Sequence, residues 1–153
     1  MHKPVVYLAG PISQVSHDEA STWRAVVAGE LDKLGIDSLD PLRGKHRFLA
    51  HKPAGDVEYT ARNHGITPQQ IVIRDKADIR KSDLVLVNFL DVAKRGLMVF
   101  GSTMEISYAA DQGKPVIIVT NDCASPWLTY HSIRIVPTLE EAIAVIHQYF
   151  GGY

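Results

Sequence analysis

Two carboxylates, Glu105 and Asp75, are the residues of this chain whose types and positions point to chemistry. Glu105 ends the segment Gly101-Ser102-Thr103-Met104-Glu105, which opens a predicted helix after a glycine-bearing loop. It shares a helix face with apolar residues, where a charge is costly unless it is used or paired. Free N–H groups at the helix N-terminus favour its ionised form. Asp75 follows Ile71 by four residues, so it also lies near the apolar face of a predicted helix.

Paired carboxylates serve as nucleophile and general acid in glycosyl transfer. In that chemistry Glu105 would attack an anomeric carbon, and Asp75 would give a proton to the departing base. Two ordinary interpretations stay open beside this one. The helix dipole favours a glutamate near many helix N-termini, with no catalytic role. Asp75 is also placed to pair with Arg74 or Arg80 on a solvated helix face.

The elements that must position these carboxylates alternate between strand and helix. Apolar, β-rich runs predict strands at residues 4–9, 36–39, 84–89, 116–120 and 133–136. Periodicity and start signals predict helices at residues 17–34, 67–82, 101–112 and 138–149, with a short helical segment from 125. Residues 40–66 show no sustained period, and a loop of that length is usually functional.

Helix boundaries carry recognisable signals. Ser16 with Glu19 and Thr138 with Glu141 match the capping box, Thr67-Pro68 is a strong helix start, and Gly35 fits a helix end. The buried face of the first helix is predicted from its apolar positions, which are Ala20, Trp23, Val26, Val27, Leu31 and Leu34.

Alternating strands and helices predict a single α/β domain over residues 1–153 with a parallel sheet. Five strands indicate a flavodoxin-like fold with strand order 2-1-3-4-5, whose ligand crevice lies at the carboxyl ends of the first, third and fourth strands. Gly10, Asn88 and the segment 101–105 are all expected at that edge of the sheet.

Composition excludes several classes of protein. The chain has 153 residues, is 46% hydrophobic and 22% charged, and carries a net charge of −1, which is typical of a globular domain with mixed surface charge. Its Lys and Arg residues form no basic stripe for nucleic acid, and no apolar run reaches membrane-spanning length. A single cysteine, Cys123, and the absence of a signal-peptide pattern lead us to expect a cytoplasmic location.

Other motifs point to no cofactor or metal. Gly10 lies in Ala9-Gly10-Pro11, outside any glycine-rich dinucleotide or phosphate-loop pattern. The segment 101–103 can bind an anion only as many helix N-termini can. Trp127 can stack on a base or pack at a subunit contact. Three loop histidines fit no metal-ligand spacing, and these are His46, His51 and His64.

Four segments in this order resemble nucleoside 2-deoxyribosyltransferases over almost the whole chain. Tyr7-Leu8-Ala9-Gly10-Pro11-Ile12 is the first, and Arg74-Asp75 followed by Asp78-Ile79 and Ser82–Asn88 is the second. Gly101–Ile106 and Pro137–Ile143 complete the set. The resemblance implies a flavodoxin-like fold and transfer of 2-deoxyribose between nucleobases through a covalent glycosyl-enzyme. It also implies a homo-oligomer, built from dimers, in which a neighbouring subunit completes each site.

The resemblance assigns roles residue by residue. Glu105 is expected to be the nucleophile, Asp75 the group that handles the proton of the base, and Tyr7 the residue that orients the nucleophile. Substrate contacts are expected from Gly10, Pro11, Arg43, Asp78, Asn88, Gly101, Ser102, Ser125, Trp127 and the C-terminal Tyr153. The implied substrates are nucleosides and free nucleobases, with no cofactor and neither nucleic acid nor membrane as a partner.

This chain departs from the resembled family in three places. Val99 stands where some members have an aspartate that contacts the base, so base selection should differ. Ser125 and Trp127 are the nearest candidates for the residue that reaches a neighbouring site. The first loop, residues 12–15, has no arginine for a phosphate, which favours nucleosides over nucleotides.

Two rival functions remain at this point. A hydrolase of the same fold would use the same carboxylates but pass the sugar to water instead of a base. A non-enzymatic nucleotide-binding module would keep ligand affinity after Glu105→Ala and turn over nothing.

Overall fold

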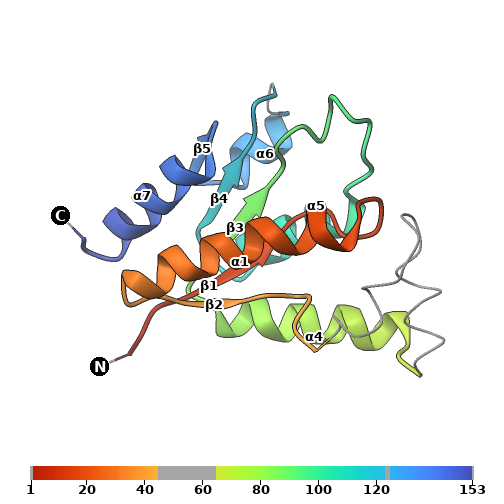
Figure 1. The fold of residues 1–153 in the computed structure, drawn as a ribbon, viewed down its shortest axis with the longest axis horizontal. Coiled ribbons are helices and arrows are strands. Elements are labelled where there is room, and N and C mark those ends of the chain that lie inside the picture. Colours follow the sequence, from red (N-terminus) through yellow and green to blue (C-terminus); the bar gives the residue numbers. More distant parts are fainter. Residues whose placement is uncertain (1, 45–64, 123–124, 153) are drawn as a thin grey trace.

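The computed structural model describes residues 2–44, 65–122 and 125–152, and it confirms the predicted architecture in this part of the chain (Figure 1). The strands are β1 Val5–Ala9, β2 Asp37–Leu39, β3 Leu84–Asn88, β4 Val116–Val119 and β5 Arg134–Val136. The helices are α1 His17–Lys33, α4 Pro68–Lys81, α5 Phe100–Asp111, α6 Pro126–Tyr130 and α7 Leu139–Tyr149.

All strands are parallel, in the order β2-β1-β3-β4-β5. This is the predicted order 2-1-3-4-5. Because β1 and β3 are paired on both edges and covered on both faces, their sequences are continuously apolar rather than alternating. β2 is shorter, and its pairing with β1 ends at Tyr7 and Leu39. The carboxyl end of β1 therefore continues beyond its neighbour.

The sheet lies between two helical layers (Figure 1). Alternate residues of each strand face opposite layers. Val6 and Leu8 of β1 pack against α1 and α7. Tyr7 and Ala9 face the other layer, where Ile79 of α4 and Ile106 and Ala109 of α5 form the core. Tyr7 is thus directed toward the two helices that carry the predicted catalytic carboxylates.

Local signals set the helix boundaries as expected. Ser16 and Glu19 form a reciprocal capping box at α1, as do Thr67 and Gln70 at α4. At α7 only half of the predicted box is present, because Thr138 accepts from the backbone N–H of Glu141 without the return bond being described. Helices α1 and α4 therefore each begin directly after a residue whose side chain accepts a hydrogen bond from an otherwise free backbone N–H group.

The buried face of α1 differs from the prediction. Val26 is 58% exposed and Leu34 is 37% exposed, whereas the fully buried Arg24 joins Ala20, Val27 and Leu31. Positions 20, 24, 27 and 31 follow helical spacing, so a cation occupies a place that an apolar residue usually fills.

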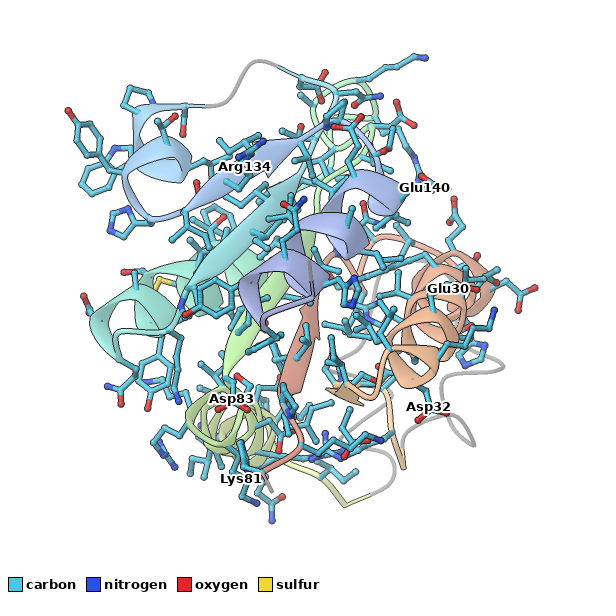
Figure 2. All side chains as sticks on the ribbon, turned by 90° about the vertical axis from the view of Figure 1, so that its left-hand side faces the viewer. Glu30, Asp32, Lys81, Asp83, Arg134 and Glu140 are labelled. Atoms are coloured by element: carbon cyan, nitrogen blue, oxygen red, sulfur yellow. The ribbon has the colours of Figure 1, made fainter. Side chains whose placement is uncertain are left out.

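Several predictions fall outside the described residues: the histidines at 46, 51 and 64, Cys123, and Tyr153. Within the described ranges no helix is long and apolar enough to cross a membrane. Figure 2 shows Glu30 and Asp32 on α1 and Lys81 at the end of α4.

Candidate active site

Tyr7 is the residue of β1 that links the sheet to the site. Its side chain is fully buried on the α4 and α5 side of the sheet. Burial raises the pKa of the phenol far above 10.0, and the charges of Glu105 and Asp75 raise it further. Among the described residues its hydroxyl has no partner at ideal hydrogen-bond geometry, but a weak hydrogen bond toward Glu105 adds to the shift. The phenol is therefore neutral and available as a donor.

Asp75 and Glu105 lie on adjacent helices, α4 and α5, and both are half-buried. Solvent does not reach Oδ1 of Asp75 or Oε2 of Glu105. Both carboxylates act on the phenol of Tyr7, so the three groups form one electrostatic cluster. Arg74 and Arg80, the two partners considered for Asp75, each donate to another acceptor. Arg74 donates to the carbonyl of Arg43, and Arg80 donates to the hydroxyl of Tyr108 at 2.8 Å.

Two cavities meet at this carboxylate pair. The smaller one, of about 170 Å³, lies at the carboxyl edge of the sheet, and Gly10, Pro11, Gly101 and Ser102 are among its lining residues. The larger one, of about 580 Å³, is a groove between α4 and α5. Its walls include Ile71, Val72, Ile79, Met104 and Tyr108, and it shares Ile71, Asp75, Gly101 and Glu105 with the smaller cavity.

The placement of Glu105 in α5 corrects one part of the sequence argument. α5 begins at Phe100, with Val99 as its cap, so Glu105 is the sixth helical residue. The field of a helix N-terminus falls off within the first turn. The N-terminus of α5 therefore does less for the charge of Glu105 than the sequence indicated, and other groups must stabilise that charge.

Gly10 is held in a tight packing position. A Cβ at this residue would lie 3.1 Å from the carbonyl oxygen of Asn88 and 3.1 Å from Cζ2 of Trp23. Glycine therefore lets the turn after β1 close against the end of β3. The side chain of Asn88 accepts a hydrogen bond from the backbone N–H of Leu90 at 3.1 Å, so it shapes the loop after β3.

Arg43 and Asp78, two predicted substrate contacts, bind each other. Both guanidinium nitrogens of Arg43 reach Asp78, at 2.6 and 2.7 Å, and Asp78 is only 2% exposed. Hydrogen bonding to Asp78 raises the pKa of Arg43. Neither residue lines either of the two cavities at the carboxylate pair. This bidentate pair fixes the segment after β2 to α4.

Ser125 and Trp127 lie at α6, away from both cavities of this subunit. Ser125 is the N-cap of α6, and its hydroxyl accepts from the backbone N–H of Leu128. Trp127 is 75% exposed and stacks on His131 with ring centroids 5.9 Å apart. The structure thus brings Tyr7, Asp75, Glu105, Gly10, Pro11, Gly101 and Ser102 together, and Asn88 lies against Gly10 without lining either cavity. Arg43, Asp78, Ser125 and Trp127 also line neither cavity.

Sequence reasoning missed Arg24 and the lining residues Ile12, Ser13, Leu42 and Met98. Arg24 left a signal, because a charge lies on the apolar face of α1. Ile12 and Ser13 lie in the first loop, which the family resemblance already indicated. Leu42 and Met98 left no signal, since their loops meet the site only in the folded chain.

Comparison with known families decides the relationship of this chain. Residues 6–135 match the model of the family described as nucleoside 2-deoxyribosyltransferase. The chain belongs to that family. The match spans Tyr7, Asp75 and Glu105, so all three residues of the cluster lie in the part that defines a deoxyribosyltransferase-family domain. No curated protein sequence matches the chain significantly.

Solved structures share the deoxyribosyltransferase-family fold at low identity. The 2-deoxyribosyltransferase of Bacillus psychrosaccharolyticus is 17% identical, with a TM-score of 0.58, and the match covers 91% of this chain and 90% of that one. The molybdenum cofactor binding protein of Rippkaea orientalis has 17% identity and a TM-score of 0.60, covering 98% and 99%. The molybdenum cofactor carrier protein of Chlamydomonas reinhardtii has 14% identity and a TM-score of 0.60, covering 99% and 100%. At these identities the likeness concerns the fold alone.

Proposed function

We propose that this protein transfers 2-deoxyribose from one nucleobase to another through a covalent intermediate on Glu105. The observation that carries the proposal is the convergence of Glu105 and Asp75 at the junction of two cavities, with the buried, neutral phenol of Tyr7 coupled to both carboxylates. Family membership supports glycosyl chemistry at that place. A nucleophile, a proton carrier and a hydrogen-bond donor are the groups this reaction requires.

The first half-reaction breaks the bond between the sugar and the base. A carboxylate oxygen of Glu105 forms a bond to C1′ from the face opposite the base. As the C1′–N bond breaks, its electron pair stays on the base, and Asp75 donates a proton to a ring nitrogen. Tyr7 donates to Glu105 and holds it for attack. The products are a free base and a glycosyl ester on Glu105.

The second half-reaction reverses these steps with another base. The carboxylate of Asp75 removes the N–H proton of the incoming base, whose nitrogen attacks C1′. Glu105 leaves as a free carboxylate, and the enzyme returns to its starting state. Transfer requires that a base, rather than water, reach C1′. The apolar walls of the groove between α4 and α5 favour an organic acceptor.

Val99 lines the smaller cavity beside Met98, Gly10 and Ile12. Neither Val99 nor the five residues of α5 before Glu105 carry a carboxylate that could bind a base by hydrogen bonding. We propose that shape and apolar contact contribute more to base choice in this chain than in relatives with an aspartate at this position.

We also propose that a second copy of the chain completes the site. Apolar residues beside the groove are exposed in the single chain: Val72, Ile73, Met98, Phe100 and Met104 are 54–76% exposed. An exposed apolar face of this kind supports a subunit contact. Trp127 and Ser125 line neither cavity at the carboxylate pair of their own subunit, which is compatible with contacts to a neighbour's site.

A base-exchange assay tests the function. The protein is incubated with a deoxynucleoside and a second free base, and the products are separated by chromatography. The expected products are the exchanged nucleoside and the first free base. Free deoxyribose as the sole sugar product would indicate the hydrolase, and ligand binding without turnover would indicate a binding module. Glu105→Gln is the matched control, because it keeps the shape of the side chain but removes the nucleophile.

A further inference from the structure

Arg24 is a buried cation that the proposed reaction steps do not use. It lies on α1, its side chain is fully buried, and it stacks on the ring of Trp23 at 4.6 Å from the ring centroid. Burying a charged group is costly unless other groups satisfy it. The contacts of its guanidinium group therefore indicate what it does.

Those contacts are backbone carbonyls at the end of β1. Nε donates to the carbonyl of Leu8 at 3.2 Å, and Nη2 donates to the carbonyl of Gly10 at 3.0 Å. Nη1 donates to the carbonyl of Ala20, one turn earlier in α1. The planar guanidinium group suits this task because its donors point in several fixed directions at once.

The short length of β2 explains why those carbonyls need a partner. The carbonyl of Pro4 accepts from Asp37, on the β2 side, and that of Val5 accepts from Asp83, on the β3 side. Carbonyl direction alternates along a strand, so those of Leu8 and Gly10 also point to the β2 side. Pairing with β2 ends at Tyr7, so β2 leaves both of them uncovered. The guanidinium group of Arg24 binds these two carbonyls where a longer β2 would have paired with them.

The charge of Arg24 also acts on the site. Burial lowers the pKa of Arg24 to about 10, and the negative charges of Asp40, Glu105 and Asp75 oppose that shift. The group therefore stays protonated at neutral pH. Asp40 lies beside it, with Oδ1 at 3.7 Å from Nε. Electrostatic coupling is mutual, so the cation that these carboxylates stabilise also stabilises them.

We propose that Arg24 is a positioning residue for the reaction at Glu105. It fixes the carboxyl end of β1, which forms the wall of the smaller cavity at Gly10, and its buried positive charge favours the ionised form of Glu105. This inference rests on the proposed function. The charge of Arg24 stabilises the ionised form of Glu105, which lies at the sixth position of α5 and receives little stabilisation from the helix N-terminus.

Other ionisable groups act on Glu105 and remain constant in the test. Tyr7 lies beneath it on β1, and the groove shared with Glu105 also contains Asp75 and Lys76 of α4 and Tyr108 and Asp111 of α5.

The experiment compares Arg24→Met, Arg24→Gln and Arg24→Lys with the wild-type protein. The carboxyl carbon of Glu105 is followed by NMR as a function of pH, with Glu105→Gln used to assign its signal. We expect the midpoint of Glu105 to rise by about one pH unit in Arg24→Met and Arg24→Gln, because an opposite charge is lost. Arg24→Lys keeps the charge, and its midpoint stays near that of the wild type.

Activity gives a second readout if base exchange is observed. Arg24→Met should lower kcat by about 100-fold because the wall at Gly10 shifts, and the acid limb of its pH profile should move to higher pH. Arg24→Lys should regain part of kcat and restore the pH profile. Arg134→Met is the control for loss of a cation, since Arg134 is exposed on β5 (Figure 2).

An unchanged midpoint in a folded neutral variant would overturn the inference. Arg24→Gln covers the case in which Arg24→Met does not fold, because its amide can still donate to a β1 carbonyl. The NMR titration needs no turnover. It therefore tests Arg24 even if base exchange, and with it the proposed function, fails.

Discussion

Each member of the carboxylate cluster has a distinct chemical task in the proposed reaction. Tyr7 stays neutral because it is buried beside negative charge, Glu105 must be ionised to attack, and Asp75 must exchange a proton. Asp75 and Glu105 were predictable because carboxylates at apolar helix faces stand out in a sequence. Arg24 was missed, because its role depends on where β2 ends, and periodicity does not specify that position within one or two residues.

Asp75→Asn separates proton donation from binding. With ordinary deoxynucleosides we expect transfer to fall by about 100- to 1,000-fold, because the base then leaves without general-acid help. A 7-methylated purine deoxynucleoside carries a positively charged base that leaves without protonation, so its loss should be much smaller. Steady-state kinetics on both substrates measure the difference. Equal losses on the two substrates would contradict the role of Asp75 as the acid.

The phenol of Tyr7 provides a prediction that requires no activity. Its raised pKa means that the folded protein keeps this proton above pH 10, whereas the unfolded chain loses it there. The neutral Tyr7 phenol therefore contributes its full share to the free energy of unfolding below pH 10, and this contribution is lost as the pH rises further. By ultraviolet absorbance, Tyr7→Phe and the wild type should show the same phenolate signal between pH 9 and 11. A smaller signal in the variant would show that Tyr7 ionises in that range.

At the scale of elements, α4 and α5 face each other over the carboxylates, and their placement depends on contacts outside the helices. The segment after β2 is tied to α4 by the pair of Arg43 and Asp78. Helix boundaries and strand order were predictable because caps and apolar runs are local signals. The pairing of Arg43 with Asp78 was not, because it joins residues 35 positions apart.

Breaking this ion pair should destabilise the fold more than is usual for a surface ion pair, although the side chain of Arg43 is 41% exposed. Asp78 is buried, so Arg43→Met leaves an uncompensated buried carboxylate and should lower the free energy of unfolding by about 3 kcal/mol. Urea denaturation measures the change. The double variant Arg43→Met with Asp78→Asn should recover part of the loss. A single variant as stable as the wild type would show that the pair contributes little.

At the scale of the whole molecule, the sheet presents its site at one edge and its exposed apolar residues beside the same groove. Val72 on α4 and Met104 on α5 line the groove and are 54% and 70% exposed. The sequence predicted the sheet order, because repeated strand–helix units leave few arrangements. It did not predict this exposed face, since the exposure of Val72 and Met104 depends on how α4 and α5 pack against each other.

Substitution of the groove rim tests whether a second copy covers it. Met104→Lys and Val72→Lys should shift the protein toward a monomer of 16.9 kDa in sedimentation velocity, and base exchange should fall with the oligomer. Val26→Lys is the matched control, because Val26 is 58% exposed on α1 in the opposite layer. If both groove variants sediment as the wild type does, this face is not the subunit contact.

The covalent step at Glu105 is the central claim, and one measurement tests it directly. The protein is incubated with a 2-fluoro-substituted deoxynucleoside, in which the fluorine slows release of the sugar, and is then digested and analysed by mass spectrometry. The account predicts a fluorodeoxyribosyl adduct on the peptide that contains Glu105, with fragment ions that place it on that side chain. An adduct on another residue, or no adduct while the protein turns over normal substrates, would contradict it.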